Sequence, residues 1–312
     1  MIITASMRTD IPAFYSDWLY NRLSAGYVDV KNPYAGNNQN AYWRYRLDRE
    51  VVDAFSFCTK NPLPFIGDTR FKKFYEQMPY QIWSMTITGY DGGAEWNTLK
   101  SRDAISAFKV LSTTVGKEKV NWRFDPIIYF NDKEDQMNTV ARFAGIAKNL
   151  AGYTDKVVIS FLDHYDKVRR NLPEGFRPTP EQQLELVTIL VRVATQAGMK
   201  LFVCHDKEVD FASVGANVSG CLTISEINRI TGLNLVRPSS SHNTRDNCDC
   251  VLNADIGEYC TCPNGCRYCY ATYDYQRSIR QHDKHKPESS CLIGELPVNA
   301  TIQPVKQFSW KQ

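Results

Sequence analysis

The sequence predicts an α/β fold, built as a (β/α)8 barrel of the TIM type. Three observations predict it. Short apolar, β-branched runs recur eight times, amphipathic helical segments lie between several of them, and the residues that follow the runs are unusually polar. Parallel strands joined by helices show this alternation, and 312 residues suffice for one barrel of ordinary size with insertions.

Eight segments have the composition of buried strands. In chain order they are Ile2–Ala5, Ala54–Cys58, Gln81–Thr88, Asn121–Ile128, Lys156–Ser160, Lys200–Cys204, Asn217–Leu222 and Asp249–Ile256. Because catalytic side chains of such barrels lie just after the strands, the polar residues there are expected to converge on one rim.

Helices are expected where apolar residues recur at helical spacing, as they do over 137–150. Two further helices begin with capping boxes, in which a Thr precedes a Gln or Glu by three residues. These are Thr179 with Gln182, followed by a stop at Gly198, and Thr223 with Glu226, followed by a stop at Gly232.

The composition predicts one soluble, cytoplasmic barrel over residues 1–290, with 291–312 as a tail packed outside it or an edge strand. The first residues lack a basic region followed by a long apolar run. The most apolar run, 184–194, is too short to cross a membrane, so no membrane partner is expected. Ten cysteines in such a chain indicate metal binding or catalysis rather than disulfides. A net charge of +3 is too small to imply nucleic acid.

One loop carries a specific metal-binding pattern. Cys262, Cys266 and Cys269 are spaced by three and then two residues, and Gly265 allows a tight turn between them. Three thiolates on one loop can hold three irons of a 4Fe–4S cube and leave the fourth iron open. The alternative is a zinc knuckle, because cysteines at short spacing also bind zinc.

This loop resembles the cluster loop of radical S-adenosylmethionine (radical SAM) enzymes. The resemblance implies a 4Fe–4S cluster and S-adenosylmethionine as cofactors, with the methionine moiety on the open iron. It also implies reductive cleavage of the cofactor to methionine and a 5′-deoxyadenosyl radical that acts on an unknown substrate. A small electron donor of the flavodoxin or ferredoxin type would supply the electron.

The position of the loop in the chain is unusual for that resemblance. Radical SAM barrels normally carry the cysteine loop after their first strand, whereas here it follows the last. Because a barrel is cyclic, a circularly permuted chain can keep the same neighbours. The strand that ends at Ile256 would then take the role of the usual first strand, and Ile2–Ala5 would be the next strand around.

A wider resemblance extends to about residue 280. Blocks of sequence are similar, in the same order, to an uncharacterised prokaryotic family catalogued as domain of unknown function 1848. They lie at 8–15, 59–62, 122–127, 159–163, 248–250, 255–257 and 261–271. Cys58, where an aromatic residue is expected, and the additional Cys260 depart from the family pattern. Not every cysteine is therefore expected to be a ligand.

A second set of cysteines lies outside the loop: Cys204, Cys221, Cys248 and Cys250. Two follow expected strands and two precede the last one. Together they could hold an auxiliary Fe–S cluster or a structural zinc ion. The alternative is that Cys204 and Cys221 are ordinary small buried residues, as free cysteines often are.

Polar residues at the strand ends are the other candidates. The expected cofactor-binding residues are Arg8, Asp10, Lys60 and Tyr268, and the expected catalytic residues are Arg123, Asp125, Asp163 and His205. Arginine suits bidentate binding of a carboxylate such as that of S-adenosylmethionine. The alternatives are an Arg–Asp network that closes the barrel mouth, packing for the tyrosine, and a structural role for the histidine.

Two other functions stay open from the sequence. A zinc-stabilised module could bind nucleic acid through the basic residues of 277–286 and the aromatic residues of 42–46. A radical SAM lyase could repair nucleic-acid lesions, by analogy with spore photoproduct lyase. A zinc hydrolase is less favoured, since the five histidines form no paired motif.

Overall fold

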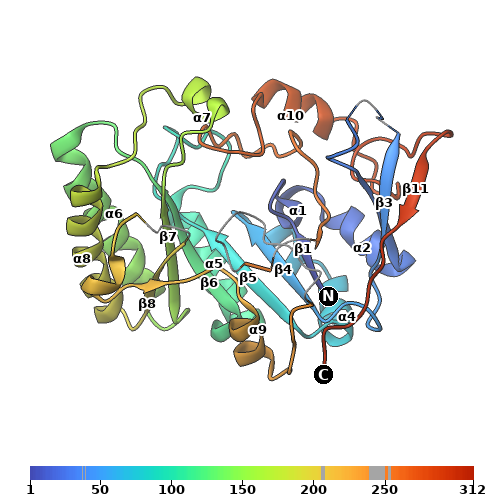
Figure 1. The fold of residues 1–312 in the computed structure, drawn as a ribbon, viewed down its shortest axis with the longest axis horizontal. Helices are drawn as coiled ribbons and strands as arrows, with labels where there is room; N and C mark the ends of the chain where they lie inside the picture. The colour runs from blue at the N-terminus through green and yellow to red at the C-terminus, as the bar shows by residue number, and fades with distance from the viewer. Residues whose placement is uncertain (37, 39, 205–207, 239–249, 252–253) are drawn as a thin grey trace.

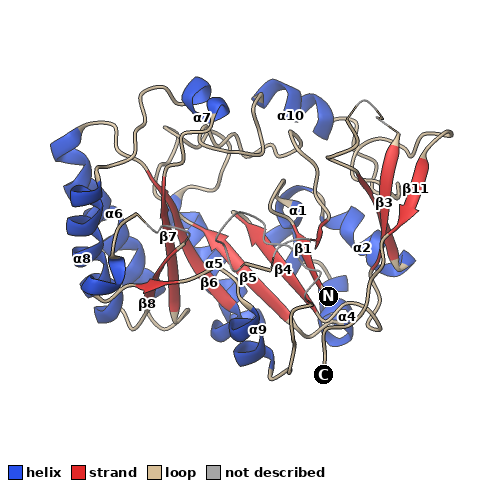
Figure 2. Ribbon diagram, viewed as in Figure 1, coloured by secondary structure: helices blue, strands red, loops and turns tan. Residues whose placement is uncertain are grey.

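The computed structural model shows an α/β fold dominated by one eight-stranded parallel sheet (Figures 1 and 2). It describes residues 1–312 except 37, 39, 205–207, 239–249 and 252–253, and except the side chains of 132 and 133. The strand order is β10-β1-β4-β5-β6-β7-β8-β9. The strands are β1 (Ile2–Ala5), β4 (Ala54–Thr59), β5 (Gln81–Thr86), β6 (Val120–Ile127), β7 (Lys156–Phe161), β8 (Lys200–Val203), β9 (Asn217–Val218) and β10 (Ala254–Asp255).

The eight-stranded parallel sheet confirms part of the predicted fold, but closure into a barrel is not found. The last two strands are shorter than expected, with two residues each. Within the described residues β9 and β10 are the two edges of the sheet and do not pair. One backbone hydrogen bond crosses the seam between the segments beside them, from Val251 N to Leu222 O at 3.1 Å.

The pairing of β10 with β1 decides where the cysteine loop lies. Ile3 is in register with Ala254 and Thr4 with Asp255, and the two strands are parallel. The segment that leads into the cysteine loop therefore lies beside the first strand of the chain. The carboxyl ends of both strands point to the same edge of the sheet.

Helices follow most strands, and the predicted capping signals are present. Thr179 Oγ1 accepts from Gln182 N, and Gln182 Oε1 accepts from Thr179 N. The helices are α1 (Ile11–Phe14), α2 (Ser16–Ala25), α3 (Leu63–Ile66), α4 (Arg70–Gln77), α5 (Ser101–Val115), α6 (Asp132–Leu150), α7 (Asp166–Asn171), α8 (Pro180–Gln196), α9 (Ile224–Thr231) and α10 (Tyr275–His282). None of the helices in the described part of the chain combines the length and apolarity that crossing a membrane requires.

A second, three-stranded sheet was not predicted. It consists of β2 (Tyr27–Lys31), β3 (Ala41–Arg46) and β11 (Thr301–Pro304), in the order β11-β3-β2. It stands at the right of Figure 1, away from α6 and α8. The segment 291–312 thus supplies an edge strand to this small sheet rather than to the large one.

One face of the large sheet packs against helices and forms the main core. Phe57 stacks on Trp83 with ring centroids 4.2 Å apart, and Trp122 packs on Phe143 of α6 at 4.8 Å. All four rings are buried. The burial of such rings is the largest single source of stability in a core of this kind.

The opposite face, here called the inner face, changes character along the strands. Its amino-terminal half is apolar, with Ile2, Ala54, Ile82 and Val158 packed around α9. Because side chains alternate between faces, the register also assigns to the inner face the residues closer to the carboxyl ends. These are polar or thiol-bearing: Thr4, Ser56, Cys58, Ser84, Thr86, Asn121, Arg123, Asp125 and Ser160.

Thr179→Ala should destabilise the protein by about 1 kcal/mol, because the first turn of α8 loses the side-chain acceptor for Gln182 N. The shift in the midpoint of urea unfolding measures the effect. Thr179→Ser keeps the acceptor and should unfold close to the wild-type midpoint. Equal midpoints for the Ala and Ser variants would show that the cap contributes nothing.

Candidate metal centres at the carboxyl edge of the sheet

The predicted cysteine loop is a closed loop directly after β10. Cys260 N donates to Ala271 O at 2.9 Å, and Cys269 N donates to Cys266 O at 3.1 Å. Gly265 has a φ of 67°, and a Cβ there would lie 3.0 Å from the Tyr275 ring and 3.2 Å from Trp96. The tight turn between the cysteines therefore depends on glycine at this position.

The loop is held against the segment that follows β5. Asn97 N donates to Asn264 O at 2.9 Å, Trp96 N donates to Gly265 O at 3.3 Å, and Arg267 N donates to Ala94 O at 2.9 Å. These bonds satisfy the backbone groups of a loop that would otherwise bury them unpaired. The three thiols are consequently presented from a fixed backbone.

Asp10 ties the loop to two strand ends. Its carboxylate accepts from Lys60 N at 2.8 Å, from Asn264 Nδ2 at 3.0 Å and from Ala13 N at 3.2 Å. Burial raises the pKa of this carboxyl group, and the hydrogen bonds oppose the rise. The predicted cofactor-binding residue Asp10 therefore holds the ends of β1 and β4 against the cysteine loop.

The environment of the three loop thiols fits metal ligation. Burial raises the pKa of Cys262 to about 12 and raises the pKa of Cys266 and Cys269 above the ordinary value of a thiol. Without a metal these thiols are therefore protonated, and a metal must displace the protons. Ala271 N donates to Cys269 Sγ at 3.3 Å, and backbone N–H groups near Cys262 oppose the rise in the pKa of its thiol. Such N–H groups stabilise a thiolate.

The three loop thiols are spread more widely than the ligands of a single metal ion. In the described part of the chain, the close groups of three ligand atoms do not include Cys262, Cys266 and Cys269. Each thiolate of a cubane binds a different iron, so the ligands of a cluster lie further apart than those of one metal ion. The loop residues fit a cluster in this respect.

A buried ionic network lies beside the loop, and sequence reasoning missed its centre, Glu95. Lys60 Nζ is 2.9 Å from Glu95 Oε1, which also accepts from Thr88 Oγ1 and Tyr268 OH. Burial alone would raise the pKa of Glu95, but Lys60 and the hydrogen bonds lower it overall. Glu95 has no spacing signal in the sequence; its place after β5 was the one available indication.

Arg8 is held at the end of β1 by Asp255, another residue not predicted as part of the site. Arg8 Nη2 donates to Asp255 O at 2.7 Å, and Asp255 also accepts from Met7 N at 2.7 Å and from Ser6 Oγ. Arg8 Nε is buried and has no hydrogen-bond partner among the described residues. Arg8 Nε lies 3.5 Å from Asp255 Oδ1, so an ion pair also holds the guanidinium at this strand end.

In the structure, two of the predicted catalytic residues contact each other and a third pairs with a different partner. Arg123 donates to Asp125, which also accepts from Ser160 Oγ of β7. Asp163 lies half-exposed beyond β7, where its carboxylate is 3.5 Å from the Arg177 guanidinium. His205 lies outside the described residues.

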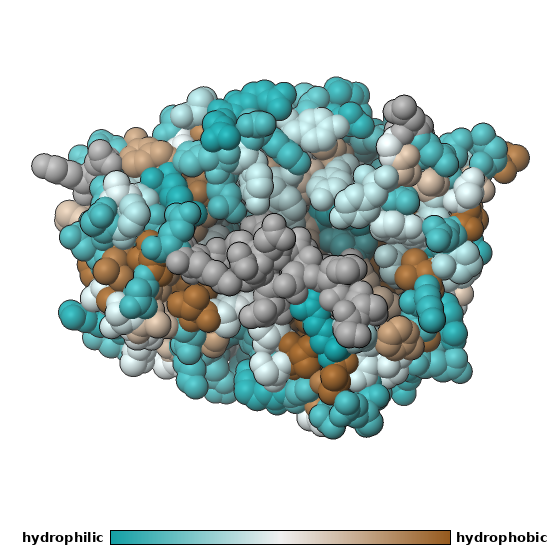
Figure 3. All heavy atoms as spheres, viewed as in Figure 1, coloured by the Kyte–Doolittle hydropathy of each residue, from teal (hydrophilic) through white to brown (hydrophobic). Residues whose placement is uncertain are grey.

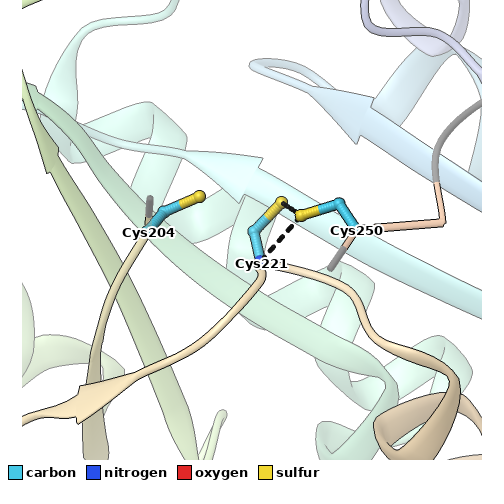
Figure 4. Close-up of side chains that lie close together, drawn as sticks. All are labelled: Cys204, Cys221 and Cys250. Carbon is cyan, nitrogen blue, oxygen red and sulfur yellow. Dashed lines mark hydrogen bonds between the residues drawn. The ribbon is translucent and has the colours of Figure 1, made fainter. Parts of the chain in front are cut away.

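Three of the second set of cysteines converge, as Figure 4 shows. The sulfur atoms of Cys204, Cys221 and Cys250 all lie within 4.8 Å of one another, which makes a group that could bind a metal. Cys221 Sγ is 3.3 Å from Cys250 Sγ. Cys248, the fourth member predicted, lies outside the described residues.

The two centres share one edge of the sheet. Burial by itself would lower the pKa of the Arg123 guanidinium. Nearby acidic groups outweigh this effect and raise its pKa well above the usual value; they are Asp125, Cys221, Cys58 and Cys204. Cys58 is in turn under the influence of both Arg123 and Asp10. Arg123 and Cys58 on the inner face are therefore under the electrostatic influence of groups at both cysteine centres.

The basic and aromatic segments are largely engaged within the protein. Tyr42 and Tyr45 are buried in β3, and Arg44 pairs with Asp29 at 2.7 Å. In the helix after the loop, His282 packs edge-on against Tyr15. Lys286, four residues beyond it, pairs with Glu295.

Comparison with protein families matches residues 2–271 to the family described as "Domain of unknown function (DUF1848)". The chain belongs to this family. The DUF1848 match includes the whole cysteine loop and all strands of the large sheet, and it ends before α10 and β11. A search of curated proteins finds no match.

Glu95→Gln should destabilise this DUF1848 protein by about 3–5 kcal/mol, because it leaves the Lys60 ammonium buried without its charged partner. Thermal unfolding measures the effect. The double variant Lys60→Met, Glu95→Gln removes both charges and should recover much of the loss. A double variant no more stable than Glu95→Gln would contradict this account of the pair.

Proposed function

We propose that this protein is a radical SAM enzyme, in which Cys262, Cys266 and Cys269 hold a 4Fe–4S cluster at the carboxyl edge of a permuted barrel sheet. The observation that carries the proposal is the set of three half-buried thiols on one loop, which do not all lie within 4.8 Å of one another as the ligands of a single ion would. When bound, the cluster supplies one electron that cleaves S-adenosylmethionine to methionine and a 5′-deoxyadenosyl radical. A small flavodoxin- or ferredoxin-type protein is the proposed donor.

The neighbours of the loop support the permutation. β10 precedes the loop and pairs with β1, and every following strand of the large sheet pairs with its successor along the chain. Moving β10 to the front of the chain would thus give a sheet in simple sequential order. In that order the loop follows the first strand, as in the enzymes that it resembles.

The inner face supports a substrate site next to the loop. Thr4 Oγ1 and Asn121 Nδ2 are buried there and have no hydrogen-bond partner among the described residues. A buried polar group without a partner costs about 1–3 kcal/mol, so such groups are usually explained by a ligand or water. A polar substrate bound between the two cysteine centres would satisfy them.

Residues around the loop take positioning roles in this proposal. Asp10 and Asn264 hold the loop, while Lys60 and Tyr268, joined through Glu95, fix one wall of the site. Arg123, held by Asp125, offers a guanidinium for the carboxylate of S-adenosylmethionine or for an anionic substrate. The rim over α7 and α10 is mostly hydrophilic in Figure 3, as a site for polar ligands requires.

Anaerobic reconstitution should load about four irons per chain on the loop, with the brown colour of a cubane cluster. Reduction in the presence of S-adenosylmethionine should then release 5′-deoxyadenosine. The triple variant Cys262→Ala, Cys266→Ala, Cys269→Ala should lose both, whereas the control Cys291→Ala should keep both. Iron content and turnover that survive in the triple variant would refute the proposal.

Asp125→Asn should lower the release of 5′-deoxyadenosine by about 10²-fold while leaving the iron content unchanged, because Arg123 would lose the charge that orients it. Ser160→Ala removes the other partner of Asp125 but keeps its charge, so a smaller loss is expected. Iron analysis and product chromatography on the same samples separate the two effects. An Asp125→Asn enzyme with full turnover would exclude this role.

The structure gives less support to the nucleic-acid alternative. Its aromatic strip is a strand of the small sheet with two of its three rings buried, and part of its basic segment is paired or packed. Stacking of bases needs exposed ring faces. The enzyme is therefore the function that the geometry favours.

A further inference from the structure

We infer that Cys204, Cys221 and Cys250 bind a single zinc ion that joins the two edges of the large sheet. This inference is independent of the cluster proposed for the cysteine loop. It rests on the distances between three sulfur atoms and on the position of these atoms at the seam between β9 and β10.

The sulfur distances match ligands of one tetrahedral ion. Tetrahedral coordination with Zn–S bonds of about 2.3 Å places neighbouring sulfurs about 3.8 Å apart. Here all three sulfurs lie within 4.8 Å of one another, and the Cys221–Cys250 distance is 3.3 Å. A disulfide would join only two of them. Ligands of a cubane, each on its own iron, would be further apart.

The chemistry of the donors selects the metal. Three thiolates are soft ligands, which favour zinc among the abundant divalent ions over magnesium or calcium. Binding would release the thiol protons to solvent. Three thiolates on Zn²⁺ leave one net negative charge, and the guanidinium of Arg123 lies near both Cys204 and Cys221 to oppose it.

The site lies where the sheet needs a link. Cys204 directly follows β8, Cys221 follows β9, and Cys250 precedes β10, as Figure 4 shows for the three side chains. Across this seam the backbone–backbone bond from Val251 N to Leu222 O is joined by two contacts of the Cys250 sulfur, with Cys221 N and with Cys221 Sγ. A metal bound to all three thiolates would hold both edges together where strand pairing does not.

Elements around the seam are already held in place for such a link. Lys156 Nζ at the start of β7 donates to Cys221 O at 3.2 Å and to Glu226 Oε2 of α9 at 2.5 Å. Leu222, Ile227 and Val251 pack together beside the thiols. This arrangement presents the thiols from a supported backbone, so binding would order little additional chain.

Zinc analysis of the full-length protein, purified in metal-free buffer, tests the inference. About one zinc per chain is expected in the wild type and in the loop variant Cys262→Ala, Cys266→Ala, Cys269→Ala. Cys221→Ser and Cys250→Ser should weaken zinc affinity on the order of a hundredfold or more. The controls Cys58→Ser, a thiol outside the group of three, and Cys291→Ser, a buried thiol elsewhere, should keep the zinc.

Cobalt binding and amide hydrogen exchange can both be measured on the wild-type protein, so these tests do not require that a variant folds. One Co²⁺ added to the metal-free wild type should give thiolate-to-cobalt charge-transfer absorption and intense tetrahedral d–d bands. Chelation should speed exchange of the Val251 amide by about tenfold, since the seam opens more often. The inference is overturned if zinc content is unaffected in Cys221→Ser and Cys250→Ser. It is likewise overturned if these thiols instead hold iron or form a disulfide that excludes cobalt.

Discussion

The parallel pairing of β10 with β1 is the constraint on which the candidate site depends. Two residues of β10 align with Ile3 and Thr4, and this short ladder brings a segment near residue 260 beside the start of the chain. Closing so long a loop is entropically costly, so the short ladder needs support. The support comes from buried polar bonds at the carboxyl edge, above all the Asp10 carboxylate, which binds Asn264 and Lys60 N together. These bonds position the cysteine loop together with its backbone bonds to the segment after β5 and the packing of Tyr268.

Buried ion pairs are the second feature of this edge of the sheet. Lys60 with Glu95, Arg123 with Asp125, and Arg8 with Asp255 all lie where little water reaches. Such pairs offer little net stability, because the loss of hydration offsets most of the attraction. Their value lies in fixed orientation: each cation is held at a defined place on the inner face. That arrangement is typical of sites that bind charged ligands.

The sequence predicted the large sheet well and its closure poorly. Short apolar runs mark β1 and β4 through β8 because these strands are buried along most of their length, which the local composition records. β9 and β10 are only two residues long, and whether two such edges pair depends on long-range geometry that no local pattern records. The small sheet was missed for a related reason. In β3 the aromatic residues are interleaved with arginines, and this pattern fits a ligand-binding surface as well as it fits a strand.

For the candidate site, the sequence by itself determined the ligand chemistry and the loop. Cysteines at short spacing with Gly265 between them specify a tight turn and a set of thiols, because both follow from neighbours in the chain. Only the tertiary structure decided which distant groups share a site. The convergence of Cys204, Cys221 and Cys250, and the burial of Glu95 between Lys60 and Tyr268, arise where separate strand ends meet at one edge. Which strand ends lie together at this edge depends on strand order and register, and the packing of the whole sheet sets both.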